Sequence, residues 1–342
     1  MNTEINKLTV IGAGVAGSSF LRTIKRGKQK IDISLIDKNN FYFPKNQTSK
    51  DPVDLNQVRK NEQLAKEVGA DFICAEVKKI SEKRKKIYLD DSKELEFENL
   101  IVASGVSNEK VDIKGTKKEG FFYLSEINPF LLKVLLQIHD EAVLSVSSLE
   151  GIKFSLLLNS LKKEVRVIAP SLEFLGQAQD KIVNILEKKG VILYLGYHLK
   201  EVIGEKNVKA VKIVKNSEDS FLEDQADSSM KVFSSQLVFI DSSLKPNLKF
   251  LGELETNLEK KSFLTKYGQI YIIGDAGSLK IKDQKCYRDN SLRAKEEGIA
   301  LAKYFLGSEV SEFELRDQKD LIKQEIQDIS DKEGKLWQNG LV

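Results

Sequence analysis

Residues 8–17 read LTVIGAGVAG, and they indicate the type of fold because a short apolar run passes directly into a glycine-rich turn. The apolar residues within 18–26 have the spacing of an amphipathic helix, and an apolar stretch over 31–36 ends at Asp37. Strand, GxGxxG turn, helix, strand and acid follow one another in the order of a Rossmann-type βαβ unit. The sequence therefore predicts an α/β fold that begins with a dinucleotide-binding unit.

The glycine spacing indicates how this unit would hold a pyrophosphate. Gly12 permits the tight turn out of the strand, Gly14 lets the backbone approach the phosphates, and Gly17 lets the helix pack closely on the strand. The helix N-terminus offers N–H groups to the phosphates, and Asp37 can accept hydrogen bonds from a ribose. A glycine-rich turn that binds nothing is the alternative, and the pattern alone does not separate NAD from FAD. The candidate binding residues in this region are Gly12, Ala13, Gly14, Val15, Ala16, Gly17, Asp37 and Lys38.

The composition is that of a globular protein with about two domains. The chain has 342 residues, whereas an ordinary domain has about 150. Hydrophobic residues make up 41% and charged residues 31%, and the net charge of +3 shows no basic excess that would indicate a nucleic-acid partner. The apolar runs are shorter than the roughly 20 residues that span a bilayer, and residues 1–12 lack a signal-peptide pattern. We therefore expect a cytoplasmic protein, and the sequence leaves a peripheral membrane contact open without supporting it.

The cysteines and histidines do not form a recognisable reactive centre in the sequence. Cys74 and Cys286 are far apart, which excludes a redox dithiol of adjacent cysteines, although the sequence leaves a bridge between them open. A reducing compartment opposes such a bridge. His139 and His198 have no metal-ligand spacing with the cysteines, so we expect no metal site. The chemistry is therefore expected to come from a bound cofactor.

Two later stretches carry a family resemblance. Residues 72–105 have the pattern of a strand, a charged β-meander and a strand that ends in ASG, and residues 269–275 read QIYIIGD before a helix at 290–306. Together with the first motif, they resemble the two-dinucleotide-binding-domain flavoproteins of the pyridine nucleotide–disulfide oxidoreductase superfamily over residues 7–307. The resemblance implies FAD as the cofactor. It also implies that further contacts to FAD come from Val77, Ala103, Ser104, Gly105, Gly274, Asp275 and Ala276.

A finer resemblance lies in residues 39–44, which read NNFYFP. This segment, with residues 71–105, is similar to type II NADH dehydrogenases and sulfide:quinone reductases. It implies an FAD-dependent oxidoreductase that passes electrons from NAD(P)H to a quinone or another acceptor. Core packing beside the cofactor explains Phe41, Tyr42 and Phe43 equally well. The glutamines of the family's AQxAxQ-like stretch are replaced by Leu292 and Glu296, so the sequence gives the quinone little support.

The second dinucleotide unit keeps its scaffold and loses its phosphate-binding residues. Strand and helix patterns alternate between residues 142 and 195, but Val146 and Ser148 stand at the first two glycine positions if Gly151 is the third. Ala-Pro-Ser at 169–171 follows the second strand, where an acid is expected, and Glu173 is the nearest carboxylate. Branched or polar side chains at close-approach positions oppose tight pyrophosphate binding. The sequence therefore predicts weak or absent NAD(P)H binding. The alternative is a shifted backbone on which serine hydroxyls bind phosphate, with NAD(P)H as a weakly bound co-substrate.

These patterns predict two Rossmann-like, three-layer α/β domains, with the second inserted in the first. We expect residues 1–106 and 242–307 to form the FAD-binding domain, residues 107–241 the NAD(P)H-binding-like domain, and residues 308–342 a charged helical tail. The tail is acidic on balance, which favours packing on protein over a membrane anchor. A flavin-binding or assembly protein with a decayed NAD(P)H site is one alternative function, and a flavin enzyme reduced by a different donor is another. The expected partner is a small-molecule electron acceptor or a redox protein.

Overall fold

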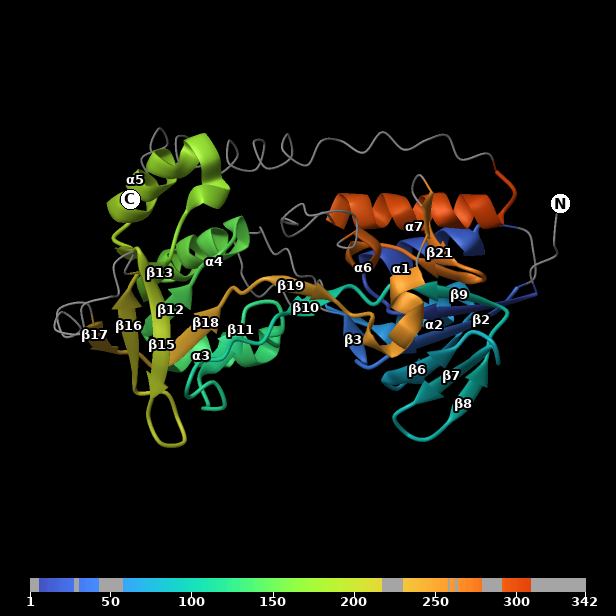
Figure 1. Ribbon diagram of the computed structural model, residues 1–342, viewed down its shortest axis with the longest axis horizontal. Helices are drawn as coiled ribbons and strands as arrows, with labels where there is room; N and C mark the ends of the chain where they lie inside the picture. Colours follow the sequence, from blue (N-terminus) through green and yellow to red (C-terminus); the bar gives the residue numbers. More distant parts are fainter. Residues whose placement is uncertain are drawn as a thin grey trace. The chain divides into compact units, whose positions relative to one another are not determined.

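The computed structural model describes residues 6–27, 31–42, 58–216, 230–257, 259–261, 264–278 and 291–308 (Figure 1). The chain divides into two compact units, and it passes between them at Ser107/Asn108 and at Ser243/Leu244. Strands β10 (Val106–Asn108) and β19 (Leu244–Pro246), which pair with each other, carry these two passages. Each unit is built on a sheet with parallel strands, and the expected α/β class is confirmed.

The first unit has a seven-stranded sheet in the order β20-β21-β22-β9-β1-β2-β5. The strands β22, β9, β1, β2 and β5 run parallel, while β20 and β21 form an antiparallel extension. Their bounds are β1 Lys7–Ile11, β2 Asp32–Asp37, β5 Asp71–Cys74, β9 Asn99–Val102, β20 Glu259–Lys261, β21 Leu264–Tyr267 and β22 Ile270–Ile272.

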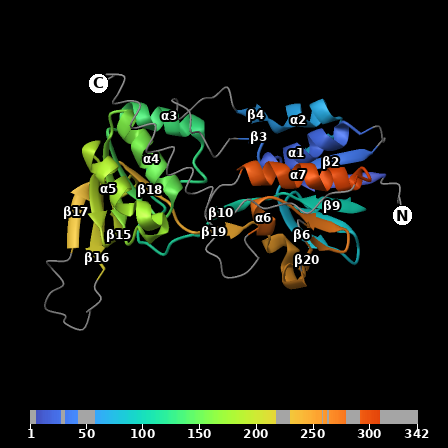
Figure 2. The ribbon, with the colours of Figure 1, turned by 90° about the horizontal axis from the view of Figure 1, so that it is seen from above.

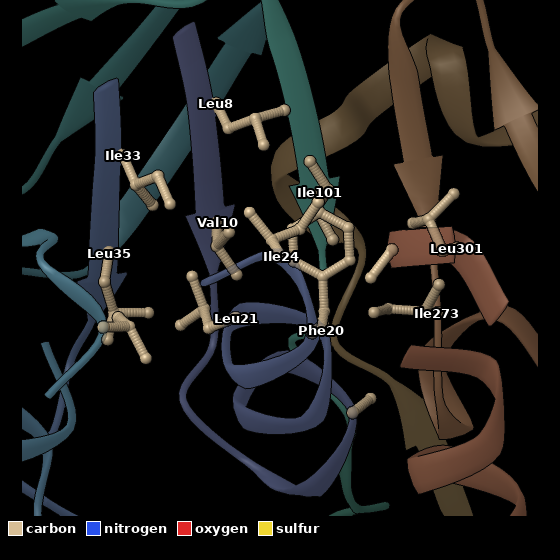
Figure 3. Packing of buried hydrophobic residues seen from close by; sticks show 14 of the residues in the cluster. Leu8, Val10, Phe20, Leu21, Ile24, Ile33, Leu35, Ile101, Ile273 and Leu301 are labelled. Atoms are coloured by element: carbon tan, nitrogen blue, oxygen red, sulfur yellow. The ribbon is translucent and has the colours of Figure 1, made fainter. Parts of the chain in front are cut away.

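Helices α1 (Val15–Lys25), α2 (Asn61–Val68) and α7 (Ser291–Phe305) cover one face of this sheet, and α1 lies between the other two (Figure 2). Phe20, Leu21 and Ile24 of α1 pack in one cluster with Val10 and Ile101 of the sheet (Figure 3). The sequence pattern placed the start of α1 at Ser18, and that start is wrong by three residues. Helical backbone is already formed at Val15, because Gly14 serves as the residue before the first turn.

The opposite face of the sheet is covered by the antiparallel meander of β6 (Val77–Ser81), β7 (Lys86–Leu89) and β8 (Glu94–Glu96). Ile11, Leu100 and Val102 alternate with the residues of the helix face and pack against this meander. The central strands are apolar on both faces for this reason, as in parallel sheets generally. The unit is completed by short elements with the bounds β3 Phe41–Tyr42, β4 Arg59–Lys60, the 3₁₀ segment η4 Lys249–Asn257 and α6 Asp275–Ser278.

The second unit repeats the same three layers. Its five-stranded parallel sheet has the order β11-β18-β12-β13-β14, from β11 Phe121–Tyr123, β12 Glu141–Ser145, β13 Glu164–Ala169, β14 Ile192–Leu195 and β18 Leu237–Ile240. One face packs on helical elements with the bounds α3 Pro129–Ile138, α4 Leu149–Ser160, η2 Glu173–Ala178 and α5 Gln179–Lys188. The other packs on an antiparallel sheet of β15 Tyr197–Ile203, β16 Ala210–Lys215 and β17 Met230–Ser234.

Candidate functional site

The turn between β1 and α1 has the backbone geometry that its glycines were expected to provide. Gly12 has a φ of +102°, which L side chains rarely adopt, and its amide donates to the Ile36 carbonyl at 2.8 Å. A Cβ added at Gly12 would lie 2.3 Å from the carbonyl oxygen of Ala103. A Cβ at Gly17 would lie 2.0 Å from the Gly12 carbonyl oxygen. The turn, the helix and the end of β9 are thus in close backbone contact.

Gly14 differs from these two glycines because the space beside it is open. No atom of the described residues lies within 4 Å of a Cβ added there. Gly14 is also the N-cap of α1, and no side chain caps this helix end. A helix N-terminus with free N–H groups and a bare backbone beside it can accept an anion such as a phosphate.

Asp37 holds the turn from the end of β2. One carboxylate oxygen accepts the Ala13 amide at 2.8 Å, and the other accepts the Asn39 amide at 2.8 Å. Burial raises the pKa of Asp37 above the usual range of an aspartate, and the two backbone hydrogen bonds oppose that shift. Each carboxylate oxygen has a second lone pair, so Asp37 can still accept from a ribose hydroxyl. Lys38, the next candidate residue, is exposed.

Arg59 of β4 is a residue of this site that the sequence reasoning missed. Its Nη2 donates to the Ala13 carbonyl at 2.7 Å, and its guanidinium lies 5.2 Å from the centre of the Tyr42 ring. Its Nε is buried, and it has no hydrogen-bond partner in the described part of the chain. Burial lowers the pKa of Arg59, and the neighbouring Arg22 acts in the same direction. Arg59 lies 46 residues from Ala13, with no motif around it that could have indicated this contact.

The ASG segment is fixed by Asn247, a second residue without a sequence signal. The Ser104 hydroxyl donates to the Asn247 carbonyl at 2.7 Å, and the Asn247 side-chain amide donates to the Ser104 carbonyl at 3.0 Å. The Asn247 backbone amide donates to Gly105 at 2.9 Å. These three bonds hold the chain where it turns away from β9.

The GDA segment meets the start of α1. A Cβ added at Gly274 would lie 2.9 Å from the Ala16 Cβ, and the Gly274 amide donates to the buried Glu297 carboxylate at 2.6 Å. Glu297 also accepts from Arg293 at 2.9 Å. Asp275 is half-buried and begins α6, and Ala276 is buried. Residues of all three quoted segments therefore converge on the N-terminus of α1: Gly12, Gly17 and Ala16 meet Ala103 and Gly274.

Val77, the remaining candidate, is buried in β6 and packs in the core between the sheet and the meander. Its expected backbone contact to adenine stays a prediction. Within the described part of the chain, no group of three or more His, Cys, Asp or Glu residues could hold a metal ion, and no helix is long and apolar enough to span a membrane. Cys74 is exposed. Phe43, Pro44, Cys286 and the tail from residue 309 lie outside the described residues.

The corresponding loop of the second unit, between β12 and α4, is built differently. The Val146 amide donates to Ile168 at 2.9 Å, as the Gly12 amide does to Ile36. The φ of Val146 is not positive, unlike that of Gly12, so the backbone at this turn is not left-handed. Its buried side chain fills the space beside Gly151, where an added Cβ would lie 2.9 Å from Val146 Cγ1. The same Cβ would lie 2.7 Å from the Asp241 carboxylate.

No acid follows the second strand of this unit. By its pairing, Ala169 takes the position of Asp37, and it is fully buried. Glu173 is exposed, and its amide is bonded to the Ser171 hydroxyl at 3.1 Å. Among the residues that the structure describes, a ribose therefore has no carboxylate partner at the end of β13.

The fold and the first loop define an α/β protein with a dinucleotide-binding βαβ unit. The model of the pyridine nucleotide-disulphide oxidoreductase family matches residues 6–294, and the chain belongs to this family. The chain is an oxidoreductase, and its membership of this family supports FAD as its cofactor. No curated protein sequence is similar enough to match the chain.

Solved structures share the fold at low sequence identity. A ferredoxin reductase of the CYP199A2 system from Rhodopseudomonas palustris is 16% identical with a TM-score of 0.72, covering 90% of this chain and 78% of that one. A NAD-dependent persulfide reductase from A. fulgidus is 18% identical with a TM-score of 0.70, and the chain spans 60% of its length. A thioredoxin reductase from T. acidophilum is 17% identical with a TM-score of 0.62, covering 89% and 99% of the two chains. These likenesses show the fold alone.

The two units differ in how well they fit the nucleotides that the family binds, FAD in the first unit and a pyridine nucleotide in the second. In the first unit the free helix end, the open space beside Gly14 and the Asp37 carboxylate fit the pyrophosphate and ribose of FAD. In the second unit Val146, Ala169 and Asp241 do not fit a pyridine nucleotide bound in the same way. Weak or absent binding of NAD(P)H to the second unit stays a prediction.

Proposed function

We propose that the chain is an FAD-dependent oxidoreductase of the type II NADH dehydrogenase-like kind. The first unit holds FAD, which accepts electrons from a donor and passes them to a quinone or another acceptor. The FAD part of this proposal is supported at the N-terminus of α1, where Gly12 meets Ala103 and where Ala16 meets Gly274. The segment of Phe41 and Tyr42 supports the type II-like part only by its sequence resemblance.

The roles of this chain's own residues follow from their contacts. The N-terminus of α1 binds the pyrophosphate, since its N–H groups and dipole favour an anion. Asp37 accepts from the adenosine ribose while it holds the Ala13 amide. Arg59 keeps the turn in place, because its guanidinium donates a hydrogen bond to the Ala13 carbonyl. None of the described side chains is assigned a role as general acid or base.

Two kinds of electron donor are compatible with this function. NAD(P)H is the donor of the family, and the second unit offers it a scaffold with at most weak binding. Asp241 accepts hydrogen bonds from the Ser147 amide and the Ser148 hydroxyl, in the loop where a pyridine nucleotide would bind. These contacts favour a second candidate, a flavin enzyme that a different donor reduces, such as a redox partner protein. One similar solved structure is a complex of putidaredoxin reductase with putidaredoxin, which is an example of such a pairing in another protein.

Flavin content and reduction test this proposal together. The purified protein should carry FAD, which absorbs visible light, or should take it up on reconstitution. NADH and NADPH are then added without oxygen, and bleaching of the flavin band is followed. Bound flavin that bleaches promptly supports the NAD(P)H-dependent form, and bound flavin that neither nucleotide bleaches favours the different donor. Colourless protein that cannot be reconstituted with FAD would contradict the proposed function and favour an assembly role.

A further inference from the structure

The second unit places a carboxylate at the loop that would have to accept a phosphate. Asp241 follows β18 at the carboxyl edge of the sheet, and only 3% of its surface is exposed. Its Oδ2 accepts hydrogen bonds from the Ser147 amide at 3.1 Å and from the Ser148 hydroxyl at 2.7 Å. The Ser147 hydroxyl donates to the Asp241 carbonyl oxygen. Both serines of the loop before α4 are thus bonded to Asp241.

Asp241 corresponds in position to Ala103 of the first unit. Each is the first residue after a strand that runs parallel to the first strand of its unit, β9 beside β1 and β18 beside β12. The Ala103 amide donates to Ile11 at 2.7 Å, and the Asp241 amide donates to Ser145 at 2.9 Å. Ile11 and Ser145 are the last residues of β1 and β12. A buried methyl group in the first unit is therefore a buried carboxylate in the second.

The backbone amide of the residue after the turn also has a different carboxylate partner in the two units. In the first unit the Ala13 amide donates to Asp37, which lies after the second strand. In the second unit the corresponding Ser147 amide donates to Asp241, which lies after the strand on the other side. Ser148, the N-cap of α4, makes no cap bond to its own helix, because its hydroxyl is bonded to Asp241.

We infer that Asp241 is a built-in substitute for the nucleotide pyrophosphate, and that it excludes NAD(P)H from the binding mode of the family. A helix N-terminus stabilises one anion beside it, and here the protein supplies that anion itself. A pyrophosphate brought to the same loop would meet a like charge that is shielded from water. Gly151 lacks a Cβ, and the Asp241 carboxylate uses that space. The inference rests on the proposed function only for the identity of the excluded ligand.

Removal of the carboxylate from the full chain tests this inference. Asp241→Ala introduces the residue that the first unit has, and Asp241→Asn removes the charge while keeping an acceptor for Ser147 and Ser148. Both variants should bind NADH or NADPH at least about tenfold more tightly than the wild type in equilibrium dialysis. Asp112→Asn, which removes an exposed charge from the same unit, should leave binding unchanged. Wild-type binding as tight as that of Asp241→Ala, or no gain in folded variants, would overturn the inference.

Hydrogen exchange of the wild type gives a result even where a variant does not fold. Amides of residues 146–152 should exchange at the same rate with and without millimolar NADH, because Asp241 keeps the nucleotide away. Slower exchange of this segment with NADH would overturn the inference. The flavin absorbance of each sample is recorded separately. A colourless protein would contradict the proposed function and leave the dialysis result valid, since the second unit makes these contacts by itself.

Discussion

Gly17 lies so close to Gly12 that a methyl group on Gly17 would be 2.0 Å from the Gly12 carbonyl oxygen. The first turn of α1 is therefore pressed against the turn that leads into it. Gly14, between them, has no described atom within 4 Å of an added Cβ. The three glycines thus differ in their surroundings: Gly12 and Gly17 are needed for the fold, and we propose that Gly14 leaves room for the ligand.

A pair of alanine substitutions separates these functions. Gly17→Ala should lower the free energy of unfolding of the cofactor-free protein by about 2 kcal/mol or more, because backbone must move. Gly14→Ala should leave that stability unchanged or slightly higher, since its φ of −65° suits alanine. It should weaken FAD binding about tenfold by obstructing the phosphate. Urea unfolding and FAD titration measure the two effects, and equal loss of stability in both variants would contradict this division.

Arg59 is expected to contribute to FAD affinity. Arg59→Met keeps much of the side-chain length and loses the bond to Ala13 and the Nε donor. It should weaken FAD binding about tenfold, and Arg59→Lys should restore only part, because lysine lacks the planar fork. Arg22→Met is the control, since Arg22 forms an exposed ion pair with Glu67 and should leave FAD binding unchanged. Equal effects of Arg22→Met and Arg59→Met on FAD titration would contradict the role of Arg59.

Asp37 should make both stability and cofactor binding depend on pH, with opposite signs. An unfolded aspartate has a pKa of about 3.9, and burial raises the pKa of Asp37 in the folded protein. Between these two pKa values the folded state binds more protons, so the stability of the cofactor-free protein falls as pH rises through this window. FAD retention should rise through the same window, because the ribose needs the ionised acceptor. Asp37→Asn should remove both dependences, which acid titration of flavin fluorescence and urea unfolding would reveal.

The effect of a carboxylate beside a nucleotide-binding loop can also be tested in the first unit, at Ala103. Ala103→Asp gives the first loop the carboxylate of the second, and it should reduce FAD binding more than tenfold through charge repulsion at the helix end. Ala103→Asn has the same size without the charge and should retain more FAD. Flavin absorbance per protein after dialysis measures the difference, with thermal melting to show that both variants fold. Equal FAD content in the two variants would mean that the size of the side chain at position 103, and not its charge, determines FAD binding.

The class of fold, the family and the first loop could be predicted from the sequence. Gly12, Gly14 and Gly17 could be interpreted directly because their spacing reports local backbone demands, which depend on residues close in the chain. Asp37 was found because a βαβ unit sets its distance from the third glycine. The absence of an acid at Ala169 and of glycines at Val146 and Ser148 was visible for the same reason.

The side chains that contact the two loops from distant parts of the chain could be found only in the folded structure. Asp241 lies 94 residues from Ser147, and Arg59 lies 46 residues from Ala13. These contacts arise because parallel strands end at a common edge of the sheet, which places residues after different strands side by side. Spacing along the chain carries no signal for such a meeting. Sequence could therefore show that the second site had lost its glycines, and the structure showed that a carboxylate of the protein itself is bonded to both serines of that loop.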